Sequence, residues 1–156
     1  MNPLLNRRTL MLGVAGVTLV GCGGGASADD PPKISYGKDT CARCRMIISE
    51  ERQAAGLVAG NGDRTLFDDT GEMIATVQEE GLSSRRVWVH DYRSEDWIDG
   101  TKASFVASAD VMTPMGTGVV AFTERAAADE FAASHGTTAL TWDEVLQNWQ
   151  IDTTMS

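Results

Sequence analysis

Three sulfur-bearing side chains lie within a few positions of one another in the stretch CARCRM, where Cys41 and Cys44 are followed by Met46. Two cysteines at this spacing can close a disulfide, exchange one with a partner, or bind a metal ion. Arg43 and Arg45 would favour a thiolate at either cysteine through their positive charge. The rest of the chain has to distinguish between these chemistries.

Several of these chemistries lack support elsewhere in the sequence. A thioredoxin-like redox motif is expected at the start of a helix that follows a strand, whereas a linker precedes this one. A structural disulfide across so small a loop gives little entropic stabilisation. A zinc site needs two more nitrogen or sulfur ligands, for which His90 and His135 are the candidates. Catalysis by a cysteine nucleophile acting with His90 and Asp91 is not supported by an oxyanion motif. A thiol–disulfide oxidoreductase remains the main alternative to a metal site, and a purely structural protein is a third.

Methionines in polar loops favour a soft metal. The stretch DVMTPMGTG places Met112 and Met115 around Pro114, and neither this loop nor CARCRM has the apolar stripe of a core helix. Thiolate and thioether ligands together select copper(I), whereas oxygen-preferring ions gain nothing from methionine sulfur. A single methionine is more often packing than ligand, but the combination with CxxC favours copper(I). His90 is a further candidate ligand, although hydrogen bonding at a surface or interface is the commoner role of such a histidine.

The elements around CARCRM follow from local patterns. RQAAGLVAGNGDRTLF predicts a hairpin with a two-residue turn at Asn61 and Gly62. DDTGEMIATVQEEG predicts an amphipathic helix with Asp68 and Asp69 as cap candidates and Gly81 as its end. RRVWVHDY predicts a strand.

A second group of elements repeats this order. KASFVAS and GTGVVAFT predict strands, TERAAADEFAASHG predicts a helix from Thr123 as cap candidate to Gly136, TTAL predicts a closing strand, and WDEVLQNWQ a final short helix. The sequence therefore predicts an α+β fold of two similar strand-strand-helix-strand halves, about residues 36–98 and 99–150, which resembles an internal duplication. Such a fold could bring the cysteine loop and the methionine loop to one interface.

The first residues predict export and lipid attachment. Arg7 and Arg8 precede a short apolar run, which is shorter than the roughly 20 residues that a membrane-spanning helix needs. The arginine pair resembles a twin-arginine signal, and LVGC resembles a lipobox whose Cys22 is acylated. We therefore expect a signal peptide at residues 1–21, a lipidated Cys22 that begins a flexible tether over 22–35, and an extracytoplasmic domain anchored to a membrane.

Charge and length exclude some functions. The chain carries a formal charge of −9, and loss of the signal removes two of its 13 basic residues and none of its 22 acidic ones, leaving −11. Such an acidic surface repels nucleic acid. The residues from 36 to 150 suit one compact domain, so a large multidomain enzyme is also excluded.

Five motifs, CARCRM, LFDDTGEM, VWVHDY, WIDGTKASFV and TPMGTGVVAF, occur in this order behind the export signal. Together they resemble the NosL family of copper chaperone lipoproteins, which help to assemble nitrous oxide reductase. The resemblance spans nearly all of the chain from Cys41 to Leu146. It implies a fold of two similar halves, also found in part of the organomercury lyase MerB. It also implies a membrane-anchored copper(I) carrier that is not an enzyme and has apo nitrous oxide reductase or its assembly machinery as partner.

The resemblance also implies a ligand set. Copper(I) would be bound between the halves by Cys44, Met46 and Met115, with Cys41 as an auxiliary or alternative thiolate and His90 as a further candidate. One position departs from the family pattern, which has glycine where this chain has Arg45. If the backbone there takes a positive φ, arginine costs on the order of 1 kcal/mol.

Overall fold

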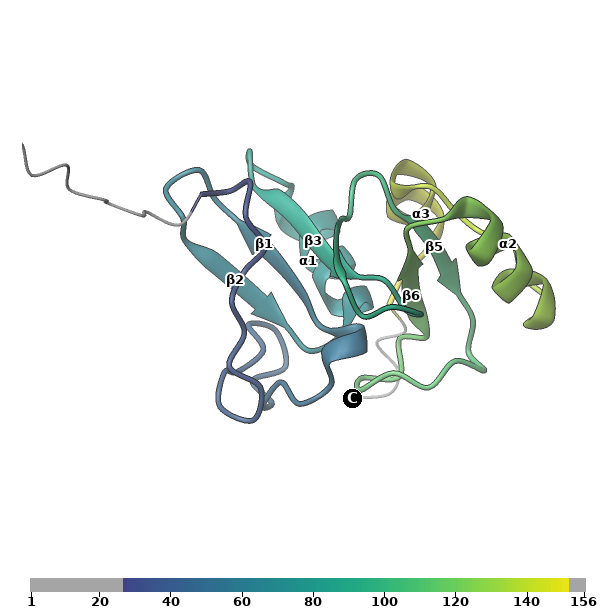
Figure 1. The fold of residues 1–156 in the computed structure, drawn as a ribbon, viewed down its shortest axis with the longest axis horizontal. Helices are drawn as coiled ribbons and strands as arrows, with labels where there is room; N and C mark the ends of the chain where they lie inside the picture. Colours follow the sequence, from purple (N-terminus) through teal and green to yellow (C-terminus); the bar gives the residue numbers. More distant parts are fainter. Residues whose placement is uncertain (1–26, 152–156) are drawn as a thin grey trace, which may run out of the picture.

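Two antiparallel sheets organise residues 27–151, the part of the chain that this computed structural model describes (Figure 1). The first sheet has the strand order β2-β1-β3-β4, and the second pairs β5 with β6. The strands are β1 (Ala55–Val58), β2 (Arg64–Phe67), β3 (Arg86–His90), β4 (Trp97–Asp99), β5 (Ser104–Ala107) and β6 (Val119–Phe122). The predicted α+β fold class is confirmed.

Three α-helices and a short 3-10 turn complete these residues. They are η1 (Glu51–Gln53), α1 (Thr70–Glu80), α2 (Arg125–Ser134) and α3 (Trp142–Asn148). Helix α1 packs on β1 and β2 of the first sheet and also contacts β6 and α3, so it lies between the two halves (Figure 1). Within residues 27–151, no helix has both the length and the apolar character needed to cross a bilayer.

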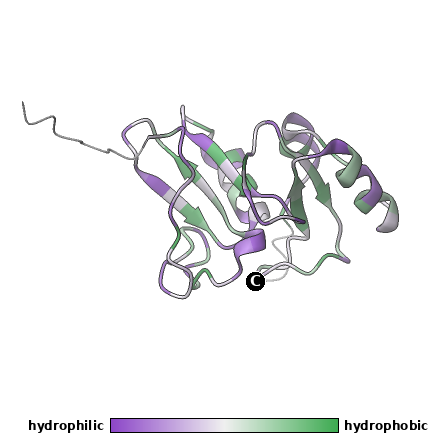
Figure 2. Ribbon diagram, viewed as in Figure 1, coloured by the Kyte–Doolittle hydropathy of each residue, from purple (hydrophilic) through white to green (hydrophobic). Residues whose placement is uncertain are grey.

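The second sheet is covered on both of its faces. Successive strand residues point to opposite faces, and Phe105 accordingly joins the core beneath the first sheet and α1, whereas Val106 joins a second core against α2. This explains why β5 and β6 are hydrophobic along their length in Figure 2 rather than alternating. The two cores share one short sheet, so the halves do not pack independently.

The turn between β1 and β2 is longer than predicted. Five residues, 59–63, connect the strands, closed by the bond from the Ala59 N–H to the Asp63 carbonyl at 2.8 Å. Gly62 has the expected positive φ of 87°. The Asn61 side chain bonds the Asp63 carboxylate at 2.7 Å and accepts the Asp63 N–H at 3.1 Å. Asn61 therefore stabilises the loop through its side chain instead of a positive φ.

Two predictions for the second half are wrong in detail. The segment TTAL forms a single bridge between Leu140 and Phe105, with both backbone hydrogen bonds at 2.7 Å, and no closing strand. Helix α2 has Glu124 at its N-cap position, and the expected cap, Thr123, instead donates its N–H to the Asp91 carboxylate at 2.6 Å. The first sheet has the additional strand β4, so an internal duplication is not confirmed.

Part of the expected tether packs on the domain. The Trp88 indole N–H donates to the Ala28 carbonyl at 3.2 Å, Arg86 pairs with Asp29 at 2.6 Å, and Pro32 is buried against Gly56. The chain therefore follows the first sheet from residue 28, well before residue 35. Cys22 and the predicted signal peptide lie outside the described residues.

Candidate metal centre

The CARCRM segment forms a closed loop that is fastened to the first sheet. A bridge joins Thr40 to Ile47, and the Cys41 N–H donates to the Met46 carbonyl at 2.8 Å. The Ala42 N–H donates to the Leu66 carbonyl at 2.8 Å, which fixes the loop beside the end of β2. These bonds direct both cysteines toward the start of α1.

The two thiols of this loop contact two carboxylates near the start of α1. The Cys41 thiol donates to Glu72 Oε2 at 2.9 Å, and the Cys44 thiol lies 3.5 Å from Asp68 Oδ1. One ligand atom from each of the four residues lies within 4.8 Å of every other. Cys41, Asp68 and Glu72 are buried and Cys44 is half-buried. Cysteine sulfur and carboxylate oxygen are both metal ligands, so this arrangement has the composition and spacing of a metal-binding site.

Burial keeps both thiols protonated when no metal is bound. It raises the pKa of the Cys41 thiol far above its usual value, and the hydrogen bond to Glu72 raises it further. Burial also raises the pKa of Cys44. The pKa of Glu72 is raised by burial as well, although the Cys41 thiol partly opposes this shift. A metal ion would have to displace the thiol protons, and the neighbouring carboxylates are placed to accept them.

The predicted influence of the arginines on the thiols is not found. Arg43 makes a bidentate pair with Glu79, at 2.9 and 2.7 Å, so its charge is already engaged. Arg45 is exposed. A thiol–disulfide oxidoreductase depends on a thiol of lowered pKa, and the raised pKa values at Cys41 and Cys44 disfavour that alternative.

Arg45 adopts the conformation that the resemblance implied for a glycine. Its φ is 67°, in the left-handed region that non-glycine residues rarely occupy. Its N–H donates to the Cys41 carbonyl at 3.2 Å, which closes the turn between the two cysteines and Met46. The loop therefore keeps its shape with arginine at this position, at a cost in conformational energy.

The methionines of the two loops, in contrast to the buried Met73 of α1, are exposed. Met46 is 56% exposed, Met115 37% and Met112 89%. The Met115 N–H donates to Asp69 Oδ2 at 3.0 Å, so the methionine loop of the second half contacts the residue that follows Asp68. The Met115 side chain lines a hollow of about 290 Å³ that it shares with Trp149. The fold thus brings the methionine loop to the helix that carries Glu72.

His90 lies apart from the four-residue group. It is 1% exposed, its Nδ1 contacts the Glu95 carbonyl at 2.7 Å and its Nε2 contacts the Tyr36 hydroxyl at 3.2 Å. Its ring packs against that of Trp97 in a tilted arrangement, with 3.8 Å between centroids. Both ring nitrogens are engaged, which favours the hydrogen-bonded role over the ligand role. Burial lowers the pKa of His90, so the ring is neutral at physiological pH.

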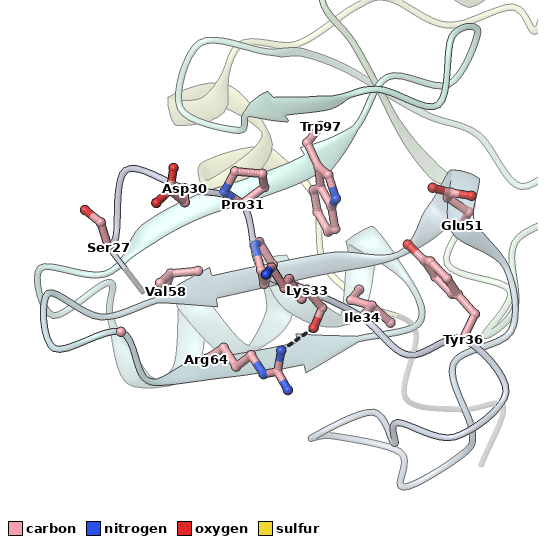
Figure 3. A pocket seen from close by; sticks show the side chains of 12 residues that line it. Ser27, Asp30, Pro31, Lys33, Ile34, Tyr36, Glu51, Val58, Arg64 and Trp97 are labelled. Atoms are coloured by element: carbon pink, nitrogen blue, oxygen red, sulfur yellow. Dashed lines mark hydrogen bonds between the residues drawn. The ribbon is translucent and has the colours of Figure 1, made fainter. Parts of the chain in front are cut away.

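A separate hollow of about 770 Å³ is lined by Tyr36 and Trp97, the two aromatic residues that contact His90. Tyr36, Glu51 and Trp97 form its wall nearest His90, and Lys33 and Arg64 lie across it (Figure 3). None of the four residues that group the thiols and carboxylates lines it. The hollow is therefore distinct from the candidate metal centre.

Two site residues, Asp68 and Glu72, were not predicted. The sequence shows them in LFDDTGEM, where the helix pattern predicts Asp68 only as a cap candidate. Asp69 proves to be the N-cap, since its carboxylate accepts the Gly71 N–H at 2.8 Å. The available signal was a second carboxylate four residues after Asp68, at the start of a helix whose first two turns are buried.

Comparison with known proteins agrees with this architecture. The structure is similar to the crystal structure of the copper chaperone NosL from Shewanella denitrificans, with a TM-score of 0.61 and 22% identity. The match covers 73% of this chain and 96% of that chain. Comparison with curated protein sequences gives no match. The NosL family model matches residues 33–150, about three quarters of the sequence, and the chain therefore belongs to the NosL family.

Proposed function

We propose that this protein is a copper(I) chaperone and not an enzyme. The observation that carries the proposal is the meeting of two thiols in a closed loop at the start of α1, with thioethers on the same loop and on the loop that Asp69 binds. Sulfur ligands select copper(I) over harder ions. Family membership and the similarity to a copper chaperone support the same assignment.

Partial exposure suits a carrier. Cys44 is half-buried and could retain the ion, whereas Met46 on the same loop is 56% exposed and could be exchanged for a ligand of an acceptor protein. Release by ligand exchange needs an incoming donor to reach the ion before the last protein ligand leaves. In this proposal Cys44, Met46 and Met115 bind the ion, with Cys41 as the auxiliary thiolate.

The two carboxylates create a competing assignment that must be tested. Two cysteines with Asp68 and Glu72 also have the composition of a zinc site. Copper(I) has no preference for carboxylate oxygen, so in the proposed chaperone these groups accept the protons that the thiols release. A zinc site would use their oxygens as ligands and would leave the methionines without a role.

We also propose the cellular setting that the sequence predicts. Lipidation at Cys22 would hold the domain on the extracytoplasmic side of a membrane, and the client would be apo nitrous oxide reductase or its assembly machinery. The lipidation proposal rests on the lipobox motif, because Cys22 lies outside the described residues. The proposal for the client rests on membership of the NosL family. A thiol–disulfide oxidoreductase is the alternative.

The decisive experiment is an anaerobic titration of the mature chain, with Cys22 replaced by alanine so that Cys41 and Cys44 supply the only thiols. Copper(I) is added against a chromogenic chelator, and zinc(II) is titrated separately. We expect one copper(I) bound more tightly than the chelator binds it, and binding weakened in the Met115→Leu variant. Tight zinc binding with copper(I) left on the chelator would refute the proposal. Rapid disulfide exchange without copper binding would support the oxidoreductase.

A further inference from the structure

The carboxylate of Asp69 joins the two halves at one point beside the metal centre. It is fully buried and accepts four hydrogen bonds. Oδ1 accepts the Gly71 N–H at 2.8 Å and the Thr117 hydroxyl, and Oδ2 accepts the Thr113 hydroxyl at 2.7 Å and the Met115 N–H at 3.0 Å. One side chain therefore caps α1 and also binds the loop that carries Met115.

The loop is shaped to fit this carboxylate. The Thr113 hydroxyl, which donates to Asp69, also accepts the Gly118 N–H at 3.1 Å, and the Gly116 N–H donates to the Thr113 carbonyl at 2.9 Å. Gly116 and Gly118 have φ values of 66° and 68°, which glycine adopts without strain. The loop thus presents two hydroxyls and one backbone N–H to a single acceptor.

A steric contact reinforces the fit. Gly71 lies in the first turn of α1 directly beneath Thr117, where an added Cβ would lie 2.5 Å from the Thr117 Cβ. Real carbon atoms do not approach so closely, so any larger residue would displace the loop. The helix therefore has glycine where alanine would be the better helix former.

The neighbouring residues Asp68 and Asp69 contact different loops. Asp69 has an extended backbone, with φ −142° and ψ 130°, and side chains of consecutive extended residues point to opposite sides. Asp68 accordingly faces Cys44, whereas Asp69 faces the methionine loop. Two adjacent residues of one backbone therefore connect the cysteine loop, through Asp68, and the methionine loop, through Asp69.

We infer that Asp69 is a positioning residue that places Met115 at the metal centre and thereby sets the copper(I) affinity. This inference rests on the proposed function. Asp69 does not bind the ion in this assignment, since four donors already occupy its oxygens. Its effect on copper is transmitted through Met115 alone, which distinguishes it from a residue that merely stabilises the fold.

The Asp69→Asn variant is the sharpest perturbation. Asparagine is as good an N-cap as aspartate, but it has one acceptor oxygen and cannot serve both Gly71 and Met115. Copper(I) affinity is measured for the wild type, for Asp69→Asn, for Met115→Leu and for the double variant. We expect Asp69→Asn to weaken binding at least about fivefold alone and less than about twofold in the Met115→Leu background, because coupled residues are non-additive.

Two further variants keep the test decisive. Asp91→Asn is the matched control, because Asp91 is also buried and also joins the halves through the Thr123 N–H, without contacting the methionine loop. It should leave copper affinity unchanged. Gly71→Ala displaces the loop sterically and removes no hydrogen-bonding group, so it should reproduce the loss of affinity even where Asp69→Asn folds poorly.

The outcomes separate this inference from the proposed function. A wild type that leaves copper(I) on the chelator refutes the chaperone itself. The positioning role alone is overturned if the wild type binds copper(I) and Met115→Leu weakens that binding, but Asp69→Asn and Gly71→Ala leave the affinity unchanged. An equal loss in Asp69→Asn and Asp91→Asn, or additive losses in the double variant, also overturns it, because the effect would then be general destabilisation.

Discussion

Replacing Arg45 with glycine should stabilise the protein, because Arg45 holds a backbone conformation that favours glycine. Its φ of 67° lies in the left-handed region, where a side chain costs about 1–2 kcal/mol. Glycine also makes the unfolded chain more flexible, which costs about 0.4–1 kcal/mol. The expected net gain in the free energy of unfolding is therefore about 0.5–1 kcal/mol.

Thermal and urea unfolding of the metal-free protein measure this gain. For a domain of this size about 1 kcal/mol corresponds to roughly 4 °C in Tm, so the variant should melt about 2–4 °C higher. Ala42→Gly is the matched control, since Ala42 is exposed on the same loop and does not have a positive φ. That change should lower the free energy of unfolding by about 0.4–1 kcal/mol.

The reasoning fails if both variants lose stability to the same extent, because the strain at Arg45 would then be absent in solution. Copper(I) affinity supplies an independent check. The glycine variant keeps the shape of the loop, so its affinity should change by less than about twofold. A larger change would mean that the positive charge of Arg45, and not only its backbone, acts on the neighbouring Cys44.

Other substitutions test the site, the anchor and the junction of the halves. Cys44→Ser should weaken copper(I) binding at least about tenfold, which corresponds to more than about 1.4 kcal/mol, and Cys41→Ser should weaken it less. Equal losses of affinity for the two variants in the chelator competition would indicate a dithiolate site. Cys22→Ala should move the protein from the membrane to the soluble fraction without changing copper affinity, and a variant that stays with the membrane would contradict lipidation. Asp91→Asn should lower the free energy of unfolding by about 1–3 kcal/mol at pH 7, because backbone N–H donors would lose their ionised acceptor. Burial alone would raise the pKa of Asp91, but N–H groups of Thr123, Ser94 and Arg93 outweigh it and the net pKa is lowered. The ionised form therefore contributes stability above about pH 4, and the difference between wild type and variant in acid unfolding should shrink as the pH falls below that value.

Much of the local structure could be predicted because it depends on neighbouring residues. The helix from Asp69 to Gly81 follows from a cap residue, an apolar periodicity and a glycine end. The predicted strands β1, β2 and β3 follow from short hydrophobic runs between turn residues. The α+β class follows from their order along the chain.

Details that depend on distant contacts could not be predicted. The expected cap Thr123 lies outside the cap position of α2 and donates its N–H to Asp91, which lies 32 positions earlier. The expected closing strand is a single bridge, because only Leu140 meets β5 in register. Local patterns favour these elements, but the path of the rest of the chain determines whether a partner is present.

The candidate metal centre shows the same division. The sequence by itself determined the sulfur chemistry, since Cys41, Cys44 and Met46 are adjacent and their affinity for a soft metal is a property of the side chains. Only the tertiary structure added the carboxylates, because the Cys41–Glu72 contact joins residues 31 positions apart. Only the tertiary structure brought the methionine loop to the start of α1, since the Met115 N–H donates to Asp69 across 46 positions. The physical reason is that the type of residue determines which ions its atoms can bind. The burial of those atoms, their proton affinity and the neighbouring ligand groups are determined by the packing of α1 between the two halves.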